Sequence, residues 1–195
     1  VAADPTNIAT TELLARIQLR AGRVDEAAAT LRTAINRQPK GDREQQMLRT
    51  SLAQLYVDAL RYTDAVAVYE EQLKDLGIGD APLTTDDEKL VAVRLLQRII
   101  EVNKRAGRVG DVTATIERMR RLLGKDDPTP DAQHIAFLRD QGKKSEALQA
   151  VRAARQRYPE QTGFLRLEAQ TLADLGRVDE GVALLRTLLK GSIDD

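Results

Sequence analysis

A seven-residue stretch, Ala21-Gly22-Arg23-Val24-Asp25-Glu26-Ala27, is the feature that most constrains the fold, because related stretches occur four more times. Aligned on their last residue, at positions 27, 65, 112, 147 and 181, the five copies are 38, 47, 35 and 34 residues apart. A recurring period near 34 residues predicts a stack of structural repeats. Gly22 suits a left-handed turn between two helices, and an acidic residue after it suits the first turn of the second helix.

Apolar residues around the first copy have helical spacing. Ala27, Leu31, Ala34 and Ile35 follow the i, i+4, i+7, i+8 steps of one helical face, and the pattern stops before Pro39. The small side chains of Ala27 and Ala34 would let two helix backbones approach closely. The sequence around each copy therefore predicts a helical hairpin.

This pattern resembles the tetratricopeptide repeat, a 34-residue helix-turn-helix with small and large residues at fixed places and a closing Pro. The matching residues of repeat one are Leu14, Gly22, Ala27, Leu31, Ala34 and Pro39. Those of repeat four are Ile135, Leu138, Gly142, Ala147, Val151, Ala154 and Pro159. The resemblance implies an all-α fold, an α-solenoid of about five helix-turn-helix units in a right-handed superhelix.

The five repeats span about residues 8–41, 46–79, 93–126, 128–161 and 162–195, and we expect a single array over residues 1–195. Residues 1–7 read as the tail of an upstream repeat. Residues 80–92 are an insertion that we interpret as a loop followed by a helix extension. In this insertion, Thr85 and Glu88 form a capping-box pattern, which predicts a long helix from about Asp86 to Arg105.

Composition excludes several classes of function. Thirty basic residues balance thirty acidic residues, which argues against a nucleic-acid partner or binding to an anionic membrane. No apolar run approaches the roughly 18 residues that membrane insertion needs. The chain has no Cys, and we find no catalytic motif and no paired His spacing. We therefore expect no enzyme, no cofactor and no metal site, and we interpret His134, the single His, as a packed core residue.

The remaining candidate for function is the concave groove, where the resemblance implies that first helices hold a peptide or partner domain. Most side chains at the matching positions can form hydrogen bonds, as a groove for an extended peptide needs. The alternative is that these charged helix faces are only solvated. The candidate peptide-binding residues are Arg16, Arg20, Gln54, Asp58, Arg94, Gln97, Arg98, Glu101, Arg105, Arg139, Arg166 and Gln170.

Charge is unevenly distributed along the chain. Repeat three carries nine basic and four acidic residues, while the insertion before it has one Lys and four acidic residues. We hypothesise that the middle of the array attracts an acidic segment of a partner. The alternative is that the basic excess faces outward or pairs with the insertion.

A second function class is a structural or oligomerisation segment of a larger multi-repeat protein, which self-associates through its end repeats. Repeat five is not followed by a polar capping helix, although terminal repeats usually need one. We expect Leu184, Leu188 and Leu189 on an exposed outer face, and a homodimer through the C-terminal repeat. The excess of Arg over Lys, with abundant Ala, is typical of a GC-rich bacterial genome.

Overall fold

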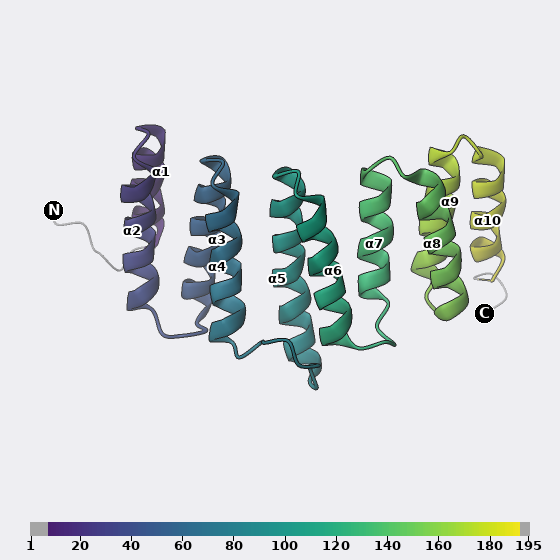
Figure 1. The fold of residues 1–195 in the computed structure, drawn as a ribbon, viewed down its shortest axis with the longest axis horizontal. Helices are drawn as coiled ribbons and strands as arrows, with labels where there is room; N and C mark the ends of the chain where they lie inside the picture. Colours follow the sequence, from purple (N-terminus) through teal and green to yellow (C-terminus); the bar gives the residue numbers. More distant parts are fainter. Residues whose placement is uncertain (1–7, 192–195) are drawn as a thin grey trace. The chain divides into compact units, whose positions relative to one another are not determined.

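The computed structural model describes residues 8–191, which form ten α-helices and contain no strand (Figure 1). The helices are α1 (Ile8–Arg20), α2 (Val24–Arg37), α3 (Arg43–Asp58), α4 (Tyr62–Asp75), α5 (Asp86–Arg105), α6 (Val109–Leu123), α7 (Thr129–Asp140), α8 (Lys144–Arg157), α9 (Thr162–Asp174) and α10 (Val178–Gly191). None of these helices is long and apolar enough to cross a membrane. The expected upstream tail, residues 1–7, lies outside the described range.

The chain divides into two compact units, which we call the N-terminal block (Val1–Gly124) and the C-terminal block (Lys125–Asp195). In the N-terminal block each helix from α1 to α6 packs against the next one in the sequence, and α1 also contacts α3. The same serial packing joins α7, α8, α9 and α10 in the C-terminal block. The expected fold class, an all-α stack of helical hairpins, is confirmed.

The five short turns between paired helices share one hydrogen-bonding pattern. In each turn a backbone N–H reaches back to the carbonyl five residues earlier, as from Arg23 to Gln18, at 2.7 to 2.9 Å. This is the Schellman motif, which ends a helix with one residue in the left-handed conformation. That residue is a Gly in four turns, but it is Leu60, at φ 59°, in the second.

Small residues allow the paired helices to approach closely, as the sequence predicts. Ala27 and Ala34 are both buried in α2. In α10, a Cβ added to Gly181 would lie 2.7 Å from the carbonyl oxygen of Ala169, which is closer than real Cβ atoms come. A larger residue at position 181 would therefore push α9 and α10 apart.

The long helix predicted after the insertion is confirmed, and so is its cap. The Thr85 hydroxyl accepts a hydrogen bond from the Glu88 N–H, and the Glu88 carboxylate accepts one from the Thr85 N–H, both at 3.3 Å. These bonds satisfy two backbone donors that the first turn of α5 would otherwise leave open. The capping box thus sets where α5 begins.

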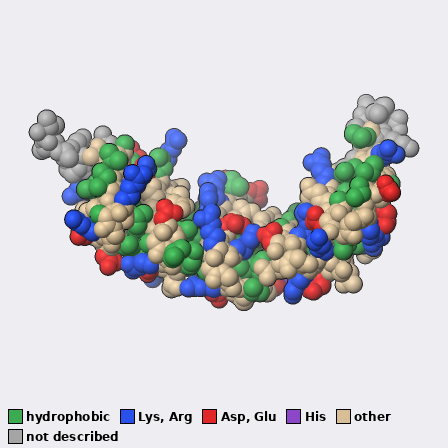
Figure 2. Space-filling view, turned by 90° about the horizontal axis from the view of Figure 1, so that it is seen from above, with side chains coloured by type: hydrophobic (Ala, Val, Ile, Leu, Met, Phe, Trp, Pro, Cys, Tyr) green, Lys and Arg blue, Asp and Glu red, His purple; other side chains and the backbone are tan. Residues whose placement is uncertain are grey.

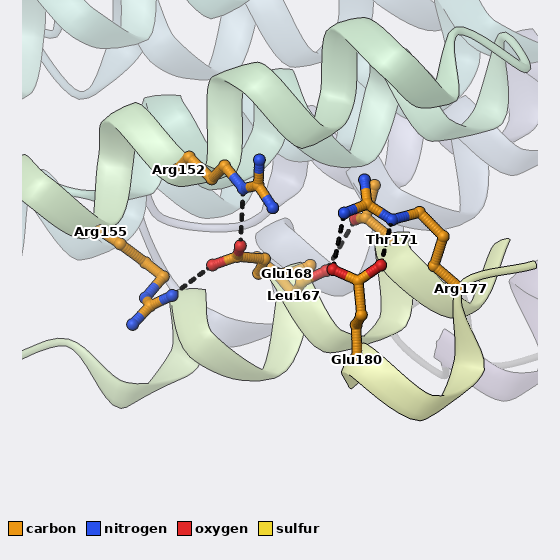
Figure 3. A network of polar contacts seen from close by, with 7 residues as sticks. All are labelled: Arg152, Arg155, Leu167, Glu168, Thr171, Arg177 and Glu180. Atoms are coloured by element: carbon orange, nitrogen blue, oxygen red, sulfur yellow. Dashed lines mark hydrogen bonds and ion pairs between the residues drawn. The ribbon is translucent and has the colours of Figure 1, made fainter. Parts of the chain in front are cut away.

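The core of the C-terminal block combines apolar packing with an ion cluster around one buried carboxylate. Ile135, Val151 and Phe164 belong to its apolar cluster. Beside it, the buried carboxylate of Glu168 on α9 accepts hydrogen bonds from two arginines of α8 (Figure 3). Arg152 Nε lies 2.8 Å from Glu168 Oε1, and Arg155 binds the other carboxylate oxygen. This cluster links the two hairpins of the block.

Candidate functional site

The first helices of the N-terminal block share a face that is hollowed between α1 and α3. A pocket of about 350 Å³ opens there, with Ala15 and Leu19 of α1 and Leu55 of α3 among its apolar lining residues. The second helices α4 and α6 line two other pockets, of about 620 and 370 Å³, and the smaller of these also includes Ile99 and Asn103 of α5. We call the surface of α1, α3 and α5 the first-helix face.

Three of the predicted groove residues meet in the pocket between α1 and α3. Arg16 projects from α1, and Gln54 and Asp58 project from α3. The Gln54 amide donates a hydrogen bond to Asp58 Oδ1 at 2.6 Å, which orients both side chains at the pocket wall. Arg20, also predicted, is exposed at the end of α1. The pocket offers polar groups of both signs over an apolar floor.

The predicted residues of α5 form an exposed stripe of basic side chains. Arg94, Arg98 and Arg105 lie four and seven residues apart, which places them along one side of the helix. Within residues 8–191, none of these three arginines has an acidic partner. Glu101 lies in the same stripe, but Lys104 neutralises it at 3.0 Å. The stripe therefore carries uncompensated positive charge, and Figure 2 shows Lys and Arg side chains projecting from the molecule.

The stripe also lies close to a buried phenol of α4. Burial raises the pKa of Tyr69, and the positive charges of Arg98 and Arg105 oppose this rise. The phenol therefore interacts electrostatically with the stripe but does not neutralise the charge of its arginines. Gln97, the remaining predicted residue of α5, is half-buried.

Other basic residues of repeat three are paired. Arg118 on α6 binds both carboxylate oxygens of Glu70 at 2.8 and 2.9 Å, and its Nε lies 3.3 Å from Asp80 in the insertion. Arg120 lies 2.6 Å from Glu117. Part of the basic excess therefore pairs with acidic residues of α4, α6 and the insertion, while the stripe on α5 does not.

The predicted residues of the C-terminal block are largely bonded to each other. Arg139 on α7 lies 2.8 Å from Asp174 and donates a hydrogen bond to Gln170 at 3.2 Å, both on α9. Arg166 is exposed on α9. The arrangement ties α7 to α9 through Arg139 and leaves the charge of Arg166 exposed.

The structure adds pocket residues that were absent from the predicted site. Glu12 lines the pocket and accepts a hydrogen bond from the Ser51 hydroxyl, a contact that joins α1 to α3. Leu31 of α2 lies at the pocket floor and is almost fully buried. The family resemblance already places Glu12 at a groove-facing position, one turn before Arg16, whereas Leu31 has the pattern of an ordinary core residue.

The interpretation of His134 as a core residue is wrong. His134 is only partly buried, and it lines a small pocket of about 220 Å³ with Asp131 and Arg157. The imidazole borders this pocket between α7 and α8, so core side chains do not enclose it. Among residues 8–191 there is no group of three or more potential metal ligands.

Comparison with known proteins identifies a repeat family at both ends of the chain. Two models of the tetratricopeptide repeat match the chain, over residues 1–52 and 137–195. No curated protein sequence matches it. Among solved structures, a tetratricopeptide repeat protein from Parabacteroides merdae has a TM-score of 0.52 and 14% identity, over 96% of this chain and 66% of that one.

Two further solved structures are similar at lower scores. The MamA protein has a TM-score of 0.47 and 11% identity, and the match covers 94% of this chain and 90% of that one. A protein with nearly identical TPR-like repeats from Podosopora anserina has a TM-score of 0.47 and 15% identity, over 94% of each chain.

Proposed function

The chain belongs to the tetratricopeptide repeat family, and from this premise we propose that it is a non-catalytic scaffold that binds an acidic segment of a partner protein. The first-helix face of the N-terminal block is the proposed binding surface. The observation that carries the proposal is the stripe of Arg94, Arg98 and Arg105, exposed and without acidic partners among the described residues. Guanidinium groups bind carboxylates with two parallel hydrogen bonds, so such a stripe favours Asp and Glu side chains.

We propose that the pocket between α1 and α3 receives another part of the same partner. Its apolar floor suits an aliphatic side chain, and Arg16, Gln54 and Asp58 at its wall suit the polar backbone of an extended peptide. The remaining predicted groove residues, Arg20, Gln97 and Glu101, are proposed contacts around these two sites. Arg139, Arg166 and Gln170 are proposed contacts of the C-terminal block.

We also propose the division into five repeats, with the boundaries given above. It is supported by the left-handed residue that precedes each second helix: Gly22, Leu60, Gly107, Gly142 and Gly176.

A labelled oligo-glutamate peptide provides the test of the acidic-segment proposal. Replacing Arg94, Arg98 and Arg105 with Ala should weaken its binding about tenfold, since exposed charge pairs contribute about 0.2–1 kcal/mol each. A matched control replaces Lys74, Arg121 and Arg186, which are exposed on the second helices α4, α6 and α10, and so removes the same net charge. Equal losses in the two triple variants would show that only the overall charge matters, and the proposed surface would be wrong.

A second candidate function is self-association through the C-terminal repeat. The observation that favours it is the exposure of Val182 and Leu185 on α10, which are 42% and 40% accessible. Leu184 is partly buried against the core and Leu189 is exposed, while the side chain of Leu188 lies outside the described residues. Light scattering over a range of protein concentrations tests this candidate, and a constant monomer mass would contradict it.

A further inference from the structure

The pocket of about 370 Å³ that α4, α5 and α6 line contains polar groups that have no partner within the described chain. Thr63 of α4, Asn103 of α5 and Asp111 of α6 belong to its lining. Apolar side chains share this lining, among them Val66 of α4 and the buried Ile99 of α5. Apolar surface with a few polar groups is typical of small-molecule sites, and the volume lies within their usual range.

Arg108, which precedes α6, lines the same pocket and lacks the carboxylate that its counterpart Arg61 has. Both arginines directly follow the left-handed residue of their turn. Arg61 binds Asp25, the second residue of α2, at 2.5 Å. Arg108 instead donates a hydrogen bond at 2.7 Å to the hydroxyl of Thr63, the second residue of α4. Because a hydroxyl is neutral, the charge of Arg108 is left without an acidic partner among residues 8–191.

The buried amide of Asn103 also lacks the partner that its counterpart Gln18 has. Gln18 accepts a hydrogen bond from the Thr30 hydroxyl at 2.9 Å. At the corresponding positions of repeat three, Asn103 has a shorter side chain, and the Thr115 hydroxyl donates only to the Asp111 carbonyl. Asn103 is 3% accessible, and its Oδ1 accepts no hydrogen bond. Since no bond fixes this amide, its rotation can turn either the oxygen or the NH₂ group toward the pocket.

The two unpaired charges near this amide have opposite signs. Asp111 is exposed in the first turn of α6, close in sequence to Arg108, and has no charged partner among the described residues. Glu70 and Arg118 line the pocket as well, but they neutralise each other. Arg121 lies about 20 Å further along the helix from Arg108. The turn between α5 and α6 therefore presents a cation, a carboxylate and an amide to the same pocket.

We propose that this pocket binds a free α-amino acid with an aliphatic side chain. The ligand carboxylate pairs with Arg108 and accepts a hydrogen bond from the Thr63 hydroxyl. The ligand ammonium group donates to the Asp111 carboxylate and to Asn103 Oδ1, while the aliphatic side chain packs on the apolar lining. An acidic peptide fits less well, because Asp111 would repel it. The inference goes beyond the proposed scaffold function, since none of these residues belongs to the peptide-binding set.

A series of three small molecules tests the two charged contacts. Titration of the 195-residue chain with L-leucine, followed by NMR, should shift the side-chain amide signals of Asn103 to saturation. Isocaproate lacks the ammonium group of leucine, and isoamylamine lacks the carboxylate. Each should bind about tenfold more weakly, because each loses a charge-assisted contact. Equal affinities of isocaproate and leucine, or no saturation by leucine at millimolar concentrations, would overturn the proposal.

The variant Thr63→Asp tests the role of Arg108. It introduces the acid that Asp25 provides for Arg61, so the new carboxylate should pair with Arg108 and weaken leucine binding about tenfold. Thr63 is exposed, so the fold should be retained. Arg94→Ala is the matched control, because it makes the same change in net charge at an exposed residue outside the pocket. An unchanged affinity of Thr63→Asp would exclude Arg108 as the contact of the ligand carboxylate.

Two variants of Asn103 test the amide contact. Asn103→Leu introduces the residue type that Leu138 and Leu172 have at the same position of their repeats. It should abolish leucine binding and raise the urea midpoint, because it removes a buried polar group that lacks a partner. Asn103→Gln should also weaken binding, since the longer side chain can bond to Thr115 as Gln18 bonds to Thr30.

These variants also separate the pocket from the scaffold proposal. Asn103→Leu should bind the oligo-glutamate peptide as tightly as the wild type, because the amide carries no charge and lies outside the basic stripe of α5. Leucine binding that is the same in Asn103→Leu, Asn103→Gln and the wild type would overturn the amide contact, whatever the result with the acidic peptide.

Discussion

The α2–α3 and α8–α9 junctions have the same place in the repeat but different chemistry. In the N-terminal block the junction contains Ile35 and Leu52, which are both buried. At the corresponding positions of the C-terminal block, Arg155 and Glu168 form an ion pair, and Arg152 completes the cluster. Consecutive hairpins can therefore be joined by apolar packing or by a buried carboxylate with two arginines. The stability of the two kinds of junction should therefore respond differently to mutation and to pH.

The largest effect is expected at the apolar junction. Leu52→Ala should lower the free energy of unfolding by about 4 kcal/mol, because Leu52 is almost fully buried and its truncation leaves a cavity. Urea unfolding followed by circular dichroism measures the change. The loss should be the same at neutral and acidic pH, since no titrating group is removed. A loss that varies with pH would mean that the apolar junction is coupled to a charge.

The ionic junction should depend on its arginines. Replacing both Arg152 and Arg155 with Ala should lower the free energy of unfolding by about 3 kcal/mol at neutral pH, because the buried carboxylate of Glu168 is left unpaired. The same urea titration measures the loss.

A matched variant removes the charge instead of its partners. Glu168→Leu introduces the residue type that Leu14 and Leu52 have at the same position of their repeats. The stability of this variant should lie close to that of the wild type, since an apolar residue can replace a buried ion pair at little cost. If Glu168→Leu were as unstable as the double arginine variant, the ion cluster itself would be required for the junction.

Acid should weaken the ionic junction and leave the apolar one unchanged. Burial of Glu168 raises its pKa, but hydrogen bonds from Arg152 and Arg155 outweigh burial, so the pKa lies below its ordinary value of 4.5. A carboxylate with a lowered folded pKa stabilises the protein above the unfolded pKa, and this contribution is lost as the pH falls through the folded value.

The variant Glu168→Gln isolates this contribution. It should be about 1 kcal/mol less stable than the wild type at neutral pH, and the difference should shrink as the pH falls below 4.5. Glu180→Gln is the control, because Glu180 also has a lowered pKa, through its hydrogen bonds with Arg177, but its side chain is exposed. A difference that is constant down to the acid transition would exclude Glu168 as the titrating group.

The sequence predicts the helices better than it predicts how charges pair. The glycine turns and the capping box act through nearby residues, so the local pattern is sufficient for them. Arg94 and Arg118 look alike in the sequence, yet Arg94 is exposed and Arg118 binds Glu70, 48 residues away. The Glu168 cluster depends on a contact between α8 and α9. The sequence shows only that Glu168 stands where other repeats have Leu, and this does not indicate that Arg152 and Arg155 bind Glu168.

The turns before the second helices provide the last and smallest contrast. Both turns of the C-terminal block have Gly at the left-handed position, whereas the second turn of the N-terminal block has Leu60 at φ 59°. An L-residue in this conformation costs about 1–2 kcal/mol, which a Gly avoids. Part of this advantage is lost, because Gly has greater conformational freedom in the unfolded chain and loses more of it on folding. Leu60→Gly should therefore raise the free energy of unfolding by about 0.5 kcal/mol, and Gly22→Leu should lower it by a similar amount. Leu60 is 72% accessible, so little apolar packing is lost with its side chain. A decrease in the urea midpoint of Leu60→Gly would show that contacts of this leucine outweigh the strain of its backbone.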